Sequence, residues 1–166
     1  MGLFSSKPKR NLLDIIGFNI SLDIEPQLKE LSKEIDFVDY VVDIKENFEL
    51  FDKAVFRFFG SKKDLSGNTS FNLILENDGS SVTFGKIKEM VDVISSEYGK
   101  DRTGKAKWSI EDEDAVSVYW EGREWIIDKK GKSYKDFKSG CIQFNLHFNL
   151  EEGISFSILG ANQLIK

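Results

Sequence analysis

The chain has 166 residues, a length typical of one domain with an extensive hydrophobic core. Its 28 acidic and 23 basic side chains give a formal net charge of −5, which argues against broad electrostatic binding of nucleic acid and favours a basic partner. The single Cys excludes an internal disulfide, and the sequence contains neither an apolar run of about 20 residues nor a signal-peptide pattern. We therefore expect a cytoplasmic protein.

The first ten residues form a basic leader, followed by a single domain that we place at residues 11–166. Residues 1–6, MGLFSS, match the pattern for N-terminal acylation, and basic side chains follow at positions 7, 9 and 10. An acyl chain combined with a basic patch can hold a protein on an anionic membrane. Because the pattern is short and common by chance, we expect membrane binding only if Gly2 is acylated.

Apolar residues at 12–16 are expected to pack at the domain edge as a helical turn or an extended strip. A helix is predicted from about Pro26, since proline favours a first turn and Leu28, Leu31 and Ile35 would share one face. A strand should begin near Phe37, where β-branched residues alternate with polar ones. Residues 48–51 and 54–59 then predict a hairpin, and residues 71–75 a further strand.

The clearest helical pattern covers residues 84–98, with Thr83 in the position of an N-cap and Gly99 able to end the helix. The segments 18–22 and 71–75 resemble each other, and each precedes one of the two predicted helices, which hairpin-like strands then follow. The sequence therefore indicates a β-α-β-β pseudo-duplication. The stripe of the second helix has 3-4-3-4 spacing and consists of Phe84, Ile87, Val91, Ile94 and Tyr98.

Residues 99–105, GKDRTGK, satisfy the spacing G-x-x-x-x-G-K of a phosphate-binding loop. The next residue is Ala106, however, which lacks the hydroxyl that holds magnesium in such loops. The segment also follows a helix, whereas a phosphate-binding loop joins a strand to a helix. We expect a flexible basic loop, with an anion site as the alternative, formed by Lys100, Arg102, Lys105 and Lys107.

Four consecutive carboxylates follow this loop, and they are candidates for binding a partner: Glu111, Asp112, Glu113 and Asp114. Their spacing lacks the repeated Asp-x-Asp series of a calcium-binding EF-hand loop, and one His and one Cys are too few for an ordinary zinc site. A carboxylate pair for acid–base catalysis could be drawn, for example, from Glu111, Asp112, Asp114 and Glu124, but the spacing selects no pair. We therefore predict no catalytic residue, metal or cofactor.

Residues 115–120 and 123–128 are predicted to form a hairpin around Glu121-Gly122, in which Gly122 supplies the positive φ. Trp120 and Arg123 would then lie opposite each other beside the turn. Such a pair could stack as an exposed cation–π contact or anchor a protein partner. Both residues therefore join the candidate partner-binding set.

The segment 141–150 alternates without a break between apolar and uncharged polar side chains, which predicts a strand, and residues 154–159 complete a hairpin with it. Its polar face would either cover the sheet or recognise a ligand by hydrogen bonds. The candidate residues are Gln143, Asn145, His147 and Asn149. The thiol of Cys141 and the imidazole of His147 would be roughly 20 Å apart on a straight strand, which excludes a Cys-His catalytic dyad.

These segments predict an α+β fold with a mainly antiparallel sheet and two principal helices on one face. The expected function is that of a non-catalytic protein-binding module, such as an adaptor or an immunity-type protein, whose acidic surface binds a protein partner. The alternative is a small-ligand binding protein that uses the polar face of the strand at 141–150.

Overall fold

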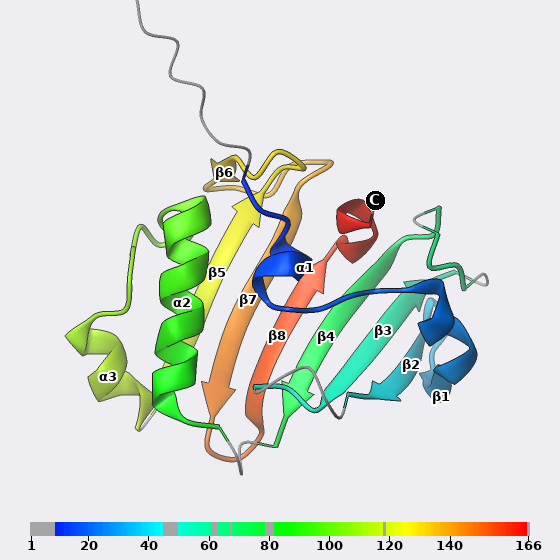
Figure 1. The fold of residues 1–166 in the computed structure, drawn as a ribbon, viewed down its shortest axis with the longest axis horizontal. Coiled ribbons are helices and arrows are strands. Elements are labelled where there is room, and N and C mark those ends of the chain that lie inside the picture. Colours follow the sequence, from blue (N-terminus) through cyan, green and yellow to red (C-terminus); the bar gives the residue numbers. More distant parts are fainter. Residues whose placement is uncertain are drawn as a thin grey trace, which may run out of the picture.

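The computed structural model describes residues 9–44, 50–60, 63–66, 68–78, 82–117 and 119–165. Within these ranges, eight strands form one antiparallel sheet with the spatial order β1-β2-β3-β4-β8-β7-β5-β6 (Figure 1). This arrangement confirms the α+β class and the mainly antiparallel sheet. The strands are Lys29–Lys33 (β1), Phe37–Asp43 (β2), Lys53–Phe59 (β3), Phe71–Asn77 (β4), Trp120–Ile127 (β5), Ser133–Tyr134 (β6), Ile142–Asn149 (β7) and Gly153–Leu159 (β8).

Helices lie on one side of this sheet. Figure 1 shows α1 and α2 in front of the same face, with α3 beyond α2 at the β5 side. Among the described helices, none combines the length and the apolar character that a membrane crossing requires. The helices are Leu12–Ile15 (α1), Phe84–Tyr98 (α2) and Ile110–Val116 (α3), with 3-10 helices at Leu22–Gln27 (η1) and Ala161–Leu164 (η2).

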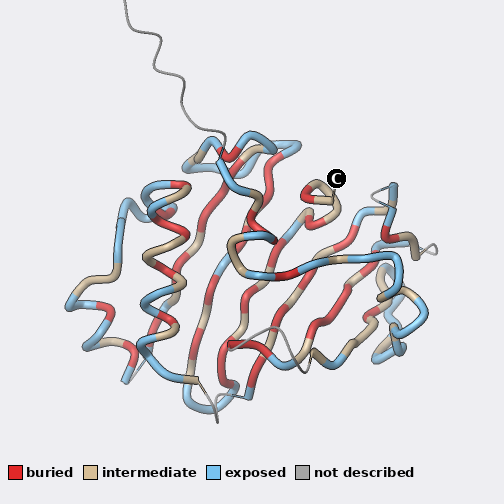
Figure 2. The backbone as a smooth tube through the Cα atoms, viewed as in Figure 1, coloured by how far each residue is buried: buried red, intermediate tan, exposed pale blue. Residues whose placement is uncertain are grey.

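Alternation along the strands builds the hydrophobic core, because successive side chains point to opposite faces of the sheet. Figure 2 shows buried residues alternating with more exposed ones along the central strands. Aromatic side chains dominate the face that the helices cover. The largest fully buried aromatic residues are Trp125, Phe56, Phe58, Phe71, Phe144 and Phe156.

Local periodicity predicted several elements correctly. α2 covers the expected residues, and Ile87, Val91 and Ile94 are fully buried. Gly99 follows the helix with φ +89°, a conformation that favours glycine, whereas Thr83 makes no side-chain cap hydrogen bond. The strands β2 and β4, the hairpin β7–β8 and the helical turn α1 are likewise confirmed.

The helix predicted from Pro26 is wrong. Pro26 lies in η1, and β1 then pairs with β2. Leu31 lies at a β-bulge and is 56% exposed, and Ile35 in the following turn is fully exposed, so no apolar surface supports a helix here. Pairing with β2 satisfies the backbone of this segment instead. Residues 18–22 are not a strand either, so the β-α-β-β pseudo-duplication is absent.

The hairpin predicted at 48–59 is also wrong, because β3 pairs with β2 on one side and β4 on the other. Residues 45–49 lie outside the described residues, whereas Leu50 and Phe51 are buried without belonging to a strand. Residues 1–8, which carry the acylation pattern, also lie outside the described residues.

Candidate partner-binding surface at helix α3

A β-bulge in β5 directs the side chains of Trp120 and Arg123 into the interior. β5 is one continuous strand, so the hairpin predicted around Glu121-Gly122 is wrong. Trp120 pairs with Phe148 and Arg123 pairs with Leu146, which leaves one extra residue between them and puts both Trp120 and Arg123 on the helix side. Both are buried, at 3% and 2% exposure, so they do not form the exposed pair that the sequence predicted.

Gly122 is the residue that permits this bulge. Its φ is +83°, in the left-handed region that L side chains rarely adopt. A Cβ added here would lie 2.2 Å from the backbone oxygen of Leu146 on the neighbouring strand, far inside van der Waals contact. The positive φ predicted for Gly122 is therefore confirmed, but it occurs in a β-bulge and not in a hairpin turn.

Arg123 is the centre of a buried ion cluster that joins β5 to α3 and to the loop after α2. Its Nη1 donates to Asp101 Oδ2 at 2.7 Å, while Nη2 and Nε donate to the two carboxylate oxygens of Asp112 at 2.5 and 3.2 Å. The three side chains are each only 1–2% exposed. Arg123 thus ties together two segments that precede it in the sequence.

Further donors complete the coordination of Asp112. Trp120 Nε1 donates to Oδ1 at 3.1 Å, and the backbone N and Oγ of Ser109 donate to Oδ2 at 2.9 and 2.8 Å. The contacts with Ser109 form a capping box that starts α3. Burial by itself would raise the pKa of Asp112, but the hydrogen bonds from Arg123, Trp120 and Ser109 outweigh it and lower the pKa to about 2.

Asp101 organises the loop that resembles a phosphate-binding loop in sequence. Its Oδ1 accepts hydrogen bonds from the backbone N of Thr103 and Lys105 and from Thr103 Oγ1, at 2.8 to 2.9 Å. The loop therefore folds around a carboxylate, and its basic side chains Lys100, Arg102, Lys105 and Lys107 are exposed. Arg102 is paired with Glu124, with Nη1 3.1 Å from both carboxylate oxygens.

The same attachment leaves most of α3 in solvent. Asp112 and Val116 are one helical turn apart and are the buried residues of this seven-residue helix. Glu111, Glu113 and Asp114 are exposed. Two large apolar side chains are also exposed, Ile110 at the first residue of the helix, 69% exposed, and Tyr119 shortly after its end, 64% exposed. We call these five exposed residues the α3 platform.

Only part of the predicted acidic site therefore lies on the surface. Glu111, Glu113 and Asp114 remain accessible, while Asp112 belongs to the buried cluster together with Trp120 and Arg123. Two lysines approach the acids over long, exposed contacts, Lys88 to Glu113 at 3.5 Å and Lys105 to Glu111 at 4.0 Å. Such pairs contribute little to stability and exchange readily with other partners.

Two signals in the sequence pointed to this site. Ser109 and Asp112 have the Ser-x-x-Asp spacing of a capping box, which announces the start of a helix. Arg123, Trp125 and Ile127 lie on the same face of a strand, and Trp125 and Ile127 are core residues. Arg123 would therefore be buried, and a buried guanidinium needs an acidic partner. Neither signal identifies Asp101 as that partner, because the contact spans 22 residues.

The predicted polar face of β7 exists, but three of its side chains form hydrogen bonds with residues outside the row. Gln143 Nε2 donates to Glu124 at 2.5 Å, and Asn145 accepts a hydrogen bond from Ser157. Asn149 caps the β7–β8 turn, where its Oδ1 accepts from the backbone N of Glu151 and Glu152. These contacts use much of the hydrogen-bonding capacity that a ligand would need.

His147 is the member of that row that borders a cavity. The cavity measures about 480 Å³ and lies at the end of the sheet where β3 begins and β4 ends. Lys53 and Glu76 form an ion pair of 2.7 Å in its wall, and Ser155 lies opposite His147 in the strand register. Within the described residues, no group of His, Cys, Asp and Glu side chains gathers as a metal site.

Comparison with known proteins adds no relationship: no family model matches the chain, and neither a curated protein nor a solved structure matches it significantly. The class of the protein therefore follows from the fold and the surface alone. It is an α+β domain with an antiparallel sheet and a firmly anchored acidic helix at one edge.

Proposed function

We propose that this protein is a non-catalytic protein-binding module, of the adaptor or immunity type, which binds a basic partner through the α3 platform. One observation carries the proposal: a buried ion cluster anchors α3, while the five residues of the α3 platform remain in solvent. Fixing a helix in advance removes the entropy cost of ordering it when a partner binds. The platform is therefore suited to recognition.

The chemistry of the platform indicates the kind of partner. Ile110 and Tyr119 offer large apolar surfaces, and tyrosine is among the residues that dominate binding energy at protein interfaces. Glu111, Glu113 and Asp114 lie between them along the chain and add negative charge, which would accelerate association with a positive surface. We therefore expect the partner to present Lys or Arg around an apolar centre.

The test removes the charges of the platform without changing its shape. The variant is Glu111→Gln with Glu113→Gln and Asp114→Asn, and its matched control is Asp23→Asn with Glu30→Gln and Glu34→Gln, three exposed acids near β1. Both variants change the net charge by the same amount. Tagged wild type and variants are incubated with lysate of the source cell, and captured proteins are quantified by mass spectrometry at low and high salt.

The proposal requires one basic protein that binds the wild type and the control but not the platform variant. Its affinity for each form, measured by calorimetry after purification, should fall about 10-fold or more for the platform variant. Equal binding by both variants would place the interface elsewhere. Thermal unfolding of both variants should match that of the wild type, because the substituted side chains are exposed.

Small-ligand binding remains a second proposal, supported by the cavity beside His147. Its charged and polar wall suits a small polar molecule better than an apolar one. A thermal-shift screen of polar metabolites checks it, with His147→Ala as the cavity variant and Asn145→Ala as the control on the same strand. A ligand that stabilises the wild type and the control, but not His147→Ala, would support this function.

A further inference from the structure

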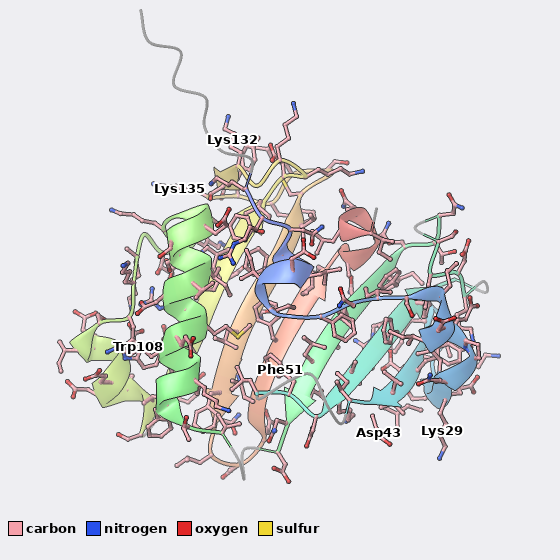
Figure 3. The ribbon with its side chains drawn as sticks, in the orientation of Figure 1. Lys29, Asp43, Phe51, Trp108, Lys132 and Lys135 are labelled. Atoms are coloured by element: carbon pink, nitrogen blue, oxygen red, sulfur yellow. The ribbon has the colours of Figure 1, made fainter. Side chains whose placement is uncertain are left out.

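A second charged surface lies at another end of the molecule, and its sign is opposite to that of the platform. Exposed cations from the start of the described chain and from the segment after β5 gather there. Figure 3 shows Lys132 and Lys135 together at this end, far from Lys29 and Asp43. We call this surface the basic pole. Its members are Lys9, Arg10, Lys129, Lys130, Lys132, Lys135 and Lys138.

The fold assembles the pole from two distant segments. Tyr98 Oη donates to the backbone oxygen of Arg10 at 2.8 Å, which holds Arg10 against the end of α2. Gly131 is buried beneath Lys9, since a Cβ at Gly131 would lie 2.9 Å from Lys9 Cδ. Between these segments lies a cavity of about 340 Å³, lined in part by Lys9, Arg10, Lys129 and Lys130.

The charge of this region contrasts with that of the whole chain. Its seven cations and the carboxylates near them, Asp14, Glu97, Asp128 and Asp136, sum to a formal charge of +3. Asp128 is occupied locally, since its carboxylate accepts hydrogen bonds from the backbone N of Lys130 and Lys132 and from Tyr134 Oη. With a net charge of −5 overall, the other charged side chains of the chain sum to −8.

Aromatic side chains lie among these cations. Phe137 is 56% exposed and stands in the sequence between Lys135 and Lys138. The ammonium groups of Lys132 and Lys138 lie 5.4 and 4.9 Å from the ring centre of Tyr134. Exposed aromatic residues next to lysines are suited to the headgroup region of a bilayer, where apolar groups enter and ammonium groups remain near phosphate.

We propose that the basic pole binds the surface of an anionic phospholipid membrane. Clusters of four to eight basic residues attract anionic headgroups electrostatically. Lysine supplies six of the seven cations, and lysine acts as a point charge without the planar fork by which arginine recognises nucleic-acid phosphates and bases. Phe137 adds an apolar group to insert. These features favour a lipid surface over nucleic acid.

This surface is separate from the α3 platform, so the two proposals stand independently. In sequence, membrane binding was expected only if Gly2 is acylated. The tertiary contact between Lys9 and Gly131 brings Lys9 and Arg10 to the cations at 129–138. The pole therefore supplies an attraction to lipid that requires no acyl group.

The test uses the full-length chain and vesicles of phosphatidylcholine with or without phosphatidylserine. The pole variant is Lys129→Gln with Lys132→Gln and Lys135→Gln, and the control is Lys29→Gln with Lys33→Gln and Lys107→Gln, all exposed lysines. Co-sedimentation should show binding only to vesicles with phosphatidylserine, lost at high salt. The pole variant should bind about 100-fold more weakly, and the control less than about 5-fold.

Two further measurements separate lipid from other anions. Phe137→Ser should weaken vesicle binding several-fold without changing its salt dependence, because it removes insertion and not charge. Fluorescence anisotropy with a labelled DNA duplex and a labelled RNA should show much weaker binding than the vesicles. The proposal is overturned if phosphatidylserine does not increase binding, if both lysine variants lose it equally, or if nucleic acid binds more tightly than vesicles.

Discussion

The α3 platform and the basic pole show two ways in which one chain uses charge. At the platform, the exposed acids depend on charges that are buried beneath them, where Arg123 holds Asp101 and Asp112 at 1–2% exposure. At the pole, every cation is exposed, and turns and backbone hydrogen bonds hold the segments that carry them. A net charge of −5 describes neither region.

This comparison shows at which positions a charged residue contributes to the stability of the fold. In the interior, a charge that loses its partner cannot be solvated, so one substitution has a large effect on stability. On the surface, water and salt screen each charge, so substitutions alter binding and leave folding nearly unchanged. The following predictions test this contrast, from the largest expected effect to the smallest.

Replacement of Arg123 should have the largest effect. Arg123→Met would leave Asp101 and Asp112 buried without their cation and should lower the free energy of unfolding by about 3–5 kcal/mol. Urea denaturation followed by tryptophan fluorescence measures it. The matched control is Arg102→Met, whose ion pair with Glu124 is about half exposed on the arginine side and should cost below about 1 kcal/mol. Similar losses of unfolding free energy in both variants would contradict the expected difference between buried and exposed charges.

Glycine substitutions compare the backbone of the two regions. Gly122 and Gly131 both have positive φ, +83° and +75°, so alanine adds similar torsional strain at each. At Gly122 the new Cβ meets a backbone oxygen at 2.2 Å, while at Gly131 it meets first the flexible side chain of Lys9 at 2.9 Å. Gly122→Ala should therefore destabilise the protein by about 2 kcal/mol more than Gly131→Ala does.

Gly60→Ala supplies the reference for torsional strain alone, since φ is +84° and no atom lies within 4 Å of its added Cβ. It should cost about 1 kcal/mol. Equal values for Gly60→Ala and Gly122→Ala would show that the bulge tolerates a side chain by shifting β7.

Acid should weaken the platform through Asp112. Its pKa falls from 3.8 in the unfolded chain to about 2 in the folded protein, so its stabilisation is complete above pH 4 and is lost as the pH falls through about 2. The loss amounts to roughly 2 kcal/mol. Urea denaturation of the wild type and of Asp112→Asn between about pH 5 and 2 measures it. The variant should be less stable at neutral pH but should show a shallower decline with acid.

The pole should show the smallest effect on folding. The triple variant Lys129→Gln, Lys132→Gln and Lys135→Gln should change the free energy of unfolding by less than about 0.5 kcal/mol. The same variant should lose most of its binding to anionic vesicles. A loss of stability above about 1 kcal/mol would mean that these lysines support the fold, and the two regions would then differ less than we infer.

Elements with a strong local pattern were predictable because burial agreed with periodicity. α2 presents its apolar stripe to the sheet, and β7 alternates between the core and the open face, so each pattern matched the layer that covers it. The segment after Pro26 had the same helical spacing, but Leu31 and Ile35 found no layer to pack against. Periodicity shows which face of an element could be buried, but it does not show whether another part of the protein covers that face.

By itself the sequence determined the α+β class, the antiparallel hairpin at the C-terminus and the positive φ of Gly122, because each depends on residues close together along the chain. Tertiary structure decided that Arg123 would be buried, that Asp112 would leave the acidic surface, and that Lys9 would join the cations after β5. These outcomes depend on contacts between distant segments, such as that between Asp101 and Arg123, which are 22 positions apart in the sequence. The charges were visible in the sequence, but only the folded chain sorted them into buried partners and exposed surfaces.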